Sequence, residues 1–399
     1  MAEQHFRLPV LAPLLYGADA ANRAPIMLFD VGCSGGIEDH WLHFGKALHA
    51  VGFDPLISEV DRLNADAGRN PNIRYEAAFV GCTAYDELFP ATLRDNRIAS
   101  RSNESFRRTS AAAHAQLKNI DYIKDNFNRG DRVVLATSRI QLDDYAAEHG
   151  IARVDLLKVD TDGHDIEVLL GAKNLLKGAL AVKIEAQFHG AVHPCANTFS
   201  NIDRLLREAG FTLFGLDAFR YTRAALPGVF ANDIAAQTID GSMQWGEAIY
   251  VRDLADPDYE RKHPFVIAGE DVIKLSVFLD IFGMPDCAAE LLLERRALIE
   301  RPGGHSVEQL LDAITPGSLG PGHSYASYIA KFRDDPSALF PSRLPADTPI
   351  APTSSGDEIA SALAAAEAAR QELAALKRST SWRLTAPLRR LADFARKGR

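Results

Sequence analysis

Two acidic segments of the chain carry residue types that could build a site for a nucleotide-like ligand. Asp160 and Asp162 follow the apolar run 154–159, and Asp30 opens the glycine-rich segment DVGCSGG at 30–36. In a parallel α/β sheet, ligands bind at the carboxyl ends of strands, and a glycine-rich turn lets the backbone approach a ligand closely. We therefore expect the two segments, far apart in sequence, to line one crevice.

The acidic residue that ends the next apolar run strengthens this interpretation. Asp54 lies 22 positions beyond Gly32, a spacing that suits a carboxylate accepting hydrogen bonds from ribose hydroxyls. A nicotinamide dinucleotide fingerprint would need glycine where Ser34 and Ile37 stand, which weakens that reading without excluding it. Each motif alone also fits a strand, a turn and a helix-capping aspartate without any ligand. Together they favour a nucleoside-containing cofactor.

Apolar runs alternate with helical patterns over most of the first 252 residues. Alternation of strands with helices of roughly 10–15 residues predicts an α/β fold with a doubly wound, mostly parallel sheet. Several runs are apolar throughout, as expected for strands that are buried on both faces. Strands are predicted at residues 26–31, 48–53, 73–80, 133–137, 154–159, 180–185, 211–216 and 248–251.

The remaining segments are predicted to be appended to this sheet. They comprise an N-terminal extension (1–25), a polar insertion (84–130), a helical accessory region (253–340), a proline-rich linker (341–356) and a helix with a basic amphipathic tail (357–399). The insertion is long for a connection, so we expect either a lid over the site or a mobile loop.

The composition excludes several classes of protein. A content of 47% hydrophobic and 24% charged residues is ordinary for a globular protein, and no apolar run approaches the ~20 residues that span a bilayer. The four cysteines show no metal-type pairing, which predicts a reducing, cytoplasmic location. The net charge is −9, but residues 377–399 hold eight Lys or Arg against one acid, leaving −16 on the rest. We therefore expect no binding to nucleic acid.

Five segments resemble the FkbM-type family of S-adenosylmethionine-dependent O-methyltransferases and occur in that family's order. They are FDVGCSGG, GFDP, SRIQLDDYAAEHGI, VDLLKVDTDGHDIEVLLGA and VKIEAQFHG, and they cover roughly residues 26–251. The resemblance implies the class I methyltransferase (Rossmann-like) sheet as the domain at 26–252, with helical C-terminal appendages and S-adenosyl-L-methionine as cofactor.

The resemblance also implies positions for the cofactor. Asp30, Gly32 and Gly36 would line its methionine end, Asp54 its ribose, and Asp160 would lie beside the sulfonium. The acid that the family often carries after the third strand is absent from FVGC, so the adenine contact moves to the neighbouring Phe79 or Val80.

Methyl transfer to a hydroxyl requires the acceptor oxygen to lie ~3–3.5 Å from the methyl carbon, and a base that takes the acceptor proton. The alternatives are that Asp160 only interacts with a helix dipole, and that Glu185 forms an ion pair with Lys183 on the same strand face. Carboxylates of this set suit a divalent ion, but we predict no metal. The predicted catalytic residues are Asp160, Asp162, Glu185 and His189, and His164 and His193 are further candidates. For His164 and His189 the alternative is an ordinary surface or core histidine.

The end of the chain, STSWRLTAPLRR, resembles a short segment that ends many bacterial glycosyltransferases and other polysaccharide-assembly proteins. Leu388, Leu391 and Phe394 form an apolar stripe among arginines, which suits an anionic membrane surface. We expect residues 377–399 to contact the inner face of the cytoplasmic membrane or a glycan-assembly complex. A solvated tail, or a helix docked on the acidic body, is the alternative.

Together the two resemblances imply O-methylation of a sugar hydroxyl in a bacterial surface polysaccharide or its precursor. Two other functions stay open. One is methylation of a hydroxyl on a small natural product or lipid, and the other is a non-catalytic scaffold of a glycan-assembly complex.

Overall fold

The computed structural model divides the chain into two compact units, Met1–Tyr325 and Ala326–Arg399. The residues that it describes are 9–17, 24–66, 70–89, 135–161, 163–221, 238–301, 304–315 and 324–335. In the second unit these comprise the greater part of helix α16 (Tyr325–Asp334) and Asp335. The predicted linker, the predicted basic tail and residues 90–130 of the predicted insertion lie outside the described residues.

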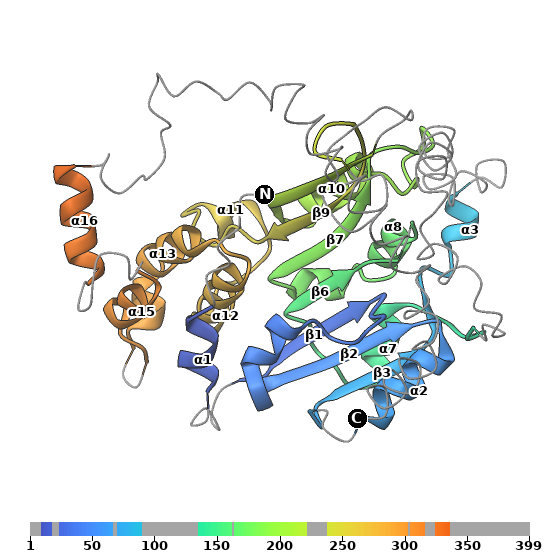
Figure 1. Cartoon of the computed structure of the whole chain (residues 1–399), viewed down its shortest axis with the longest axis horizontal. Coiled ribbons are helices and arrows are strands. Elements are labelled where there is room, and N and C mark those ends of the chain that lie inside the picture. Colours follow the sequence, from blue (N-terminus) through green and yellow to red (C-terminus); the bar gives the residue numbers. More distant parts are fainter. Residues whose placement is uncertain are drawn as a thin grey trace, which may run out of the picture. The chain divides into compact units, whose positions relative to one another are not determined.

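A seven-stranded sheet forms the centre of the described part of the first unit (Figure 1). Its order is β3-β2-β1-β6-β7-β9-β8, with β9 antiparallel to β7 and β8 and every other pair parallel. The strands are β1 (Ile26–Val31), β2 (Leu48–Asp54), β3 (Ile73–Ala77), β6 (Leu156–Val159), β7 (Ala181–Gln187), β8 (Thr212–Tyr221) and β9 (Ser242–Val251). The predicted doubly wound, mostly parallel sheet is confirmed.

The direction of winding reverses at β1, whose neighbours are β2 on one side and β6 on the other. Val31, the last residue of β1, is opposite Phe53 of β2 and Val159 of β6. The three chain segments therefore leave the sheet at nearly the same level. Such a reversal leaves a crevice outside the carboxyl ends of the strands.

Two hydrophobic cores cover the two faces of the sheet, because successive side chains of each strand point to opposite faces. Leu28 belongs to the first core and Phe29 to the second, which explains why the central strands are apolar throughout. The first core contains α1 (Leu11–Tyr16), η1 (Asp39–Ala47), α2 (Ile57–Ala65), α12 (Gly269–Ile281), α13 (Pro285–Glu294) and α15 (Val307–Ile314). The second contains α7 (Leu142–Glu148), α8 (Asp165–Leu170), α9 (Leu175–Gly178) and α10 (Phe199–Glu208). In Figure 1, α1 and α12 lie on one side of β1 and β6, and α8 lies on the other.

Helix α12, part of the predicted accessory region, is attached to the sheet by a buried ion pair. Lys274 Nζ donates to Asp155 Oδ2 (2.8 Å), and the same oxygen accepts from the Met27 amide (3.0 Å). These contacts hold α12 near the amino ends of β1 and β6, away from the crevice. The short helices α11 (Tyr259–Lys262) and α14 (Arg296–Ile299) complete this region. No helix in the described part of the chain is long and apolar enough to cross a membrane.

Two predicted strands were wrong. Residues 73–80 form strands in different sheets, because the chain leaves β3 at Ala78 and its next residues, β4 (Phe79–Val80), pair with β5 (Arg139–Ile140). The predicted strand at 133–137 does not join the main sheet in its described part, where Leu135 forms only an isolated bridge with Leu56. Helix α3 (Tyr85–Leu88) follows β4.

Candidate active site

The glycine turn after β1 lies where the ends of β1, β2 and β6 converge. Gly32 has φ +85°, and its amide donates to the carbonyl of Phe53 (2.8 Å). A Cβ atom at Gly32 would lie 1.7 Å from the carbonyl oxygen of Asp160, so no side chain fits there. The Asp160 amide in turn donates to the carbonyl of Val31 (2.8 Å). Glycine is therefore required by both the backbone angle and the close approach of β6.

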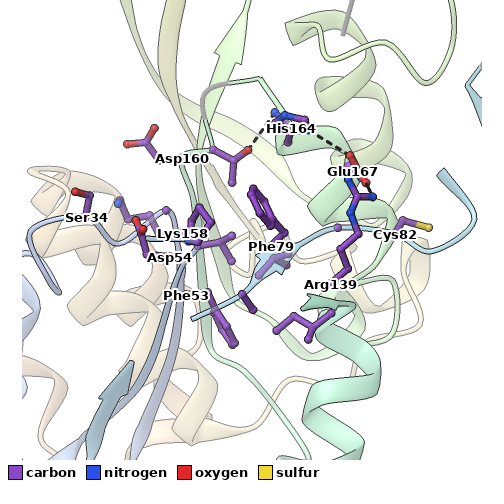
Figure 2. A pocket seen from close by; sticks show the side chains of 18 of the residues that line it. Ser34, Phe53, Asp54, Phe79, Cys82, Arg139, Lys158, Asp160, His164 and Glu167 are labelled. Carbon is purple, nitrogen blue, oxygen red and sulfur yellow. Dashed lines mark hydrogen bonds and ion pairs between the residues drawn. The ribbon is translucent and has the colours of Figure 1, made fainter. Parts of the chain in front are cut away.

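Asp54 at the end of β2 is held in one orientation. Its side chain is largely buried, and its Oδ1 accepts a hydrogen bond from the Leu56 amide (2.7 Å). Burial raises the pKa of this carboxyl above its ordinary value, against the opposing effect of that amide. Figure 2 shows Asp54 facing the same space as Ser34 and Lys158.

Gly32, Ser34, Asp54 and Lys158 line a cavity of about 740 Å³. Its walls come from the glycine turn, the carboxyl ends of β2 and β6, the strands β4 and β5, and the start of α8. In Figure 2, Phe79 lies between a group containing Lys158 and Asp160 and a second group containing Arg139 and Glu167. The cavity thus has two polar ends separated by an aromatic side chain.

A buried ion pair lies beneath the first polar end. Lys158 Nζ is 3.0 Å from Asp30 Oδ1, and Asp30 is 0% exposed. Asp30 Oδ2 is also buried and has no hydrogen-bond partner among the described residues. Burial raises the pKa of Asp30 to about 6, although the Lys158 charge opposes the shift. Burial lowers the pKa of Lys158, but the nearby carboxylates of Asp30, Asp160 and Glu38 outweigh it and the net shift is upward.

Glu38, at the same end, is surrounded by basic side chains. Its carboxylate contacts Lys183 Nζ at 2.9 and 3.1 Å and His40 Nε2 at 3.1 Å. Burial would raise the pKa of Glu38, but the hydrogen bond from His40 and the charge of Lys183 lower it to about 2. Glu38 is therefore ionised throughout the physiological range.

The second polar end is organised by Glu167 on α8. This carboxylate is buried and lies 3.4 Å from His164 Nδ1 and 3.7 Å from Arg139 Nη1. A Cβ atom on Gly81 would lie 2.7 Å from Glu167 Oε1, so the glycine that follows β4 allows this carboxylate to enter the cavity wall. Asp165, by contrast, is fully buried and accepts hydrogen bonds from Thr161 and Asn197, which is a structural role.

The predicted cofactor residues gather at the cavity with one difference. Gly32, Gly36, Asp54 and Asp160 line it, whereas Asp30 lies beneath the lining and reaches it only through Lys158. Phe79 and Val80, the predicted adenine contacts, are also in the wall.

The predicted catalytic residues are more dispersed. Asp162 lies outside the described residues. Glu185 is buried in β7 opposite Glu247 of β9 and does not line the cavity. Lys183, the alternative partner of Glu185, contacts Glu38 and Glu247. His189 Nε2 lies 2.7 Å from the carbonyl oxygen of Met243, also away from the cavity lining. The catalytic roles of these residues stay predictions.

Sequence reasoning missed four charged lining residues, Glu38, Lys158, Arg139 and Glu167. Lys158 could have been found from the sequence, because it is the one charged residue in the apolar run 156–159. A buried cation is costly unless it has a partner, so its presence there indicates a functional or structural role. Among the described residues, no three His, Cys, Asp or Glu side chains are grouped to hold a metal ion.

Comparison with known proteins adds a family match to this geometry. Residues 30–213 match the model of the methyltransferase FkbM domain. No curated protein matches the chain in sequence.

Several solved structures are similar at low identity. TehB from Haemophilus influenzae shares 10% identity over 57% of this chain and 58% of that chain, with a TM-score of 0.27. The N-terminal domain of EvdMO1 with SAH bound shares 9% over 60% and 79%, with a TM-score of 0.28. The SAM-dependent methyltransferase from Agrobacterium tumefaciens shares 11% over 60% and 58%, with a TM-score of 0.26. The chain thus spans little more than half the length of the first and third of these proteins.

Proposed function

We propose that this chain methylates a sugar hydroxyl of a bacterial surface polysaccharide or of its precursor. Its residues 30–213 are an FkbM-type methyltransferase domain, which makes it an S-adenosylmethionine-dependent methyltransferase. The main support for an O-methyltransferase is that one cavity holds two sets of residues. One set can bind the cofactor, and the other set has side chains that can take a proton from a hydroxyl acceptor. When bound, S-adenosylmethionine supplies a methyl group on a sulfonium whose departure needs no protonation.

The residues at the glycine turn fit the methionine end of this cofactor. That end is a zwitterion, and the wall offers the ammonium group of Lys158 and the carboxylate of Glu38. A lysine has three donors, so Lys158 can keep its bond to Asp30 and still bind the cofactor carboxylate. Glu38 would bind the cofactor ammonium group. Gly32 and Gly36 both line the cavity, and their positive φ angles (+85° and +100°) turn the backbone sharply at its wall.

The next part of the cavity fits a nucleoside. The Leu56 amide fixes one oxygen of the Asp54 carboxylate, which orients the other to accept hydrogen bonds from ribose hydroxyls. Phe79 and Val80 then supply an apolar wall against which an adenine ring can pack.

Two lining residues can take the proton of a hydroxyl acceptor. Asp160 follows β6 directly, beside the glycine turn, and we propose it as the general base. His164 is the second candidate, since Glu167 lies against its Nδ1 and would leave Nε2 to act on the acceptor. The pH dependence of turnover distinguishes these two candidates better than their positions do, because an aspartate base and a histidine base impose different pH dependence.

The choice of a sugar is supported by the C-terminal sequence. STSWRLTAPLRR resembles the segment that ends polysaccharide-assembly enzymes, and the tail that contains it carries a net positive charge. We propose that this tail holds the protein at the inner, anionic face of the cytoplasmic membrane. Flotation with anionic and neutral vesicles tests this, because deletion of residues 377–399 should abolish binding to the anionic ones. Retained binding, or recruitment by an assembly protein in place of lipid, would contradict it.

Calorimetric titration with S-adenosylmethionine and S-adenosylhomocysteine tests the cofactor site. Loss of a charged hydrogen-bonding group in Asp54→Ala should weaken binding about 10- to 100-fold, whereas Asp61→Ala, which removes an exposed acid of α2, should leave it unchanged. Equal binding by wild type and Asp54→Ala would refute the placement of the ribose.

An acceptor survey with methyl-labelled cofactor tests the substrate class. The panel includes free and linked sugars, lipid hydroxyls and macrolides, and we expect label on sugars. Label only on lipids or macrolides would favour the natural-product or lipid enzyme. Cofactor binding without any transfer, together with loss of partner recruitment on deleting the tail, would favour the scaffold.

A further inference from the structure

An aromatic surface lies on the sheet beyond the cavity. Gln187 of β7, Trp245 of β9 and Phe219 of β8 are in register across three neighbouring strands, so their side chains share one face. The rings of Phe219 and Trp245 stack with centroids 4.0 Å apart and planes 18° apart, and Trp245 Nε1 donates to Tyr221 Oη (3.3 Å). We call Phe219, Tyr221 and Trp245 the aromatic platform. Its two stacked rings are only partly buried.

Charged side chains connect this platform to the cavity. Two positions along the strands from the row of Gln187, Trp245 and Phe219 lies the row Glu185, Glu247 and Asp217, on the same face of the sheet. Lys183, on that face of β7, contacts both Glu247 (3.7 Å) and Glu38 (2.9 Å), and Glu38 lines the cavity. Figure 1 shows β9 beside β7, and β7 beside β6, whose end carries Asp160.

The distance between Asp160 in the cavity wall and Trp245 of the aromatic platform follows from strand geometry. Asp160 and Glu185 directly follow Val159 and Ile184, which are partners in β6 and β7. From Asp160 to Trp245 is two strand spacings, ~10 Å, across the sheet and two residues, ~7 Å, along it, which makes ~12 Å in all. This distance exceeds one pyranose ring and is close to the span of two linked rings.

The chemistry of the surface suits a sugar ring. A pyranose presents a face of C–H groups, which packs on the electron-rich face of an aromatic ring, and a rim of hydroxyl donors. Glu247, which is 40% exposed at its side chain, supplies acceptors for that rim. Gln187 is 3% exposed, and its Oε1 has no hydrogen-bond partner among the described residues, so it can accept one further donor.

We propose that the aromatic platform binds the sugar unit next to the one that is methylated, so that the acceptor is an oligosaccharide of at least two units. This inference rests on the proposed function, because it assumes that the acceptor is a sugar. It adds an acceptor subsite on β7, β8 and β9, with Trp245 as the residue that determines the length of acceptor the enzyme prefers.

Tryptophan fluorescence tests binding directly. The chain has three tryptophans, and Trp41 is 0% exposed, so in a Trp382→Phe background a ligand-induced change reports Trp245. The probes are mono- and disaccharides of glucose, galactose, mannose and rhamnose, added with S-adenosylhomocysteine. We expect at least one disaccharide to shift the emission to shorter wavelength, and its monosaccharide to do so weakly. No shift with any saccharide would overturn the platform as a sugar subsite.

Kinetics with variants test the role in turnover. For a methylated disaccharide, Trp245→Leu should raise KM roughly 3- to 10-fold with little change in kcat, while Trp245→Phe keeps an aromatic face and stays near wild type. KM for the corresponding monosaccharide should not change. Leu216→Ala is the matched control, since Leu216 is also exposed on β8 but is opposite Ala248 and so lies on the other face.

Different results would refute the sugar subsite and the proposed function. Methylation of sugars with the same disaccharide KM in wild type and Trp245→Leu would overturn the subsite and leave the proposed function intact. Transfer only to acceptors that are not sugars, with normal cofactor binding, would overturn the proposed function and the subsite with it.

Discussion

Replacement of Gly32 by alanine is the sharpest perturbation of the proposed cofactor site that the structure offers. The added Cβ would lie 1.7 Å from the Asp160 carbonyl oxygen and 2.7 Å from its carbonyl carbon. Both neighbours are backbone, so neither can rotate away. The ends of β1 and β6 must separate, and the hydrogen bond from the Asp160 amide to Val31 joins them at that level.

The expected cost has two parts that can be measured separately. An alanine at φ +85° costs about 1–2 kcal/mol, and loss of the hydrogen bond between the strand ends adds about 1 kcal/mol. We therefore expect Gly32→Ala to lower the free energy of unfolding by about 2–3 kcal/mol. Since the strand ends also position Asp160, affinity for S-adenosylhomocysteine should fall at least about 100-fold, a further loss of about 3 kcal/mol in binding.

Gly35→Ala provides the matched control. Gly35 belongs to the same turn and has φ +89°, but a Cβ atom there would meet nothing within 4 Å. This variant should show the backbone cost alone, with affinity within a few-fold of wild type. Urea unfolding and calorimetric titration measure both quantities. The reasoning is refuted if Gly32→Ala binds S-adenosylhomocysteine as tightly as Gly35→Ala does.

Three further predictions concern the charged groups around the sheet. Lys158→Met leaves the buried Asp30 carboxylate without its cation and should lower the free energy of unfolding by about 3–5 kcal/mol, while a second change, Asp30→Leu, should restore most of it in urea titrations. Because the pKa of Glu38 is lowered from 4.5 to about 2, its stabilisation is complete above pH 4.5 and is lost as the pH falls towards 2. Glu38→Gln should therefore flatten the dependence of Tm on pH in that window, and an unchanged slope would contradict the assignment. Arg252 is buried and its guanidinium donates to several backbone carbonyls, so Arg252→Lys should lower the free energy of unfolding by about 2 kcal/mol without altering cofactor affinity.

Most of the residues proposed to bind the cofactor could be assigned to one crevice from the sequence, because their signals are local. The positive φ of Gly32 and Gly36 is a property of single residues, and Asp54 ends the next strand along the chain. A strand, a turn and an acid at fixed spacing can be read without knowing which strands pair. The order of strands then brings Asp160 to the same place by the general rule for parallel sheets.

The rest of the site depends on pairing between distant strands, which sequence patterns do not encode locally. An ion pair between Lys183 and Glu185, neighbours on one strand face, was the alternative to a site role for Glu185, but no sequence pattern indicated that Lys183 contacts Glu38 at the start of η1 and Glu247 on β9. The strand predicted at 73–80 divides because Phe79 finds a partner in β5, more than fifty residues later in the chain. Likewise, nothing in the sequence places Trp245 opposite Phe219.

The two faces of the sheet differ at its carboxyl end, and this difference bears on how an acceptor enters. On the face of the second core, Val31, Val159, Ile184 and Ala248 are all buried apolar residues, so that face is closed by α8 and α10. On the other face, charged residues follow one another across the same strands: Asp30, Lys158, Lys183, Glu185 and Glu247. Asp30, Lys158 and Glu185 are buried, whereas Lys183 and Glu247 are partly exposed, so a polar ligand can reach this face at β7 and β9. An acceptor that rests on Trp245 would therefore approach from the η1 side, with Glu38 and Lys183 between its second sugar unit and the cofactor.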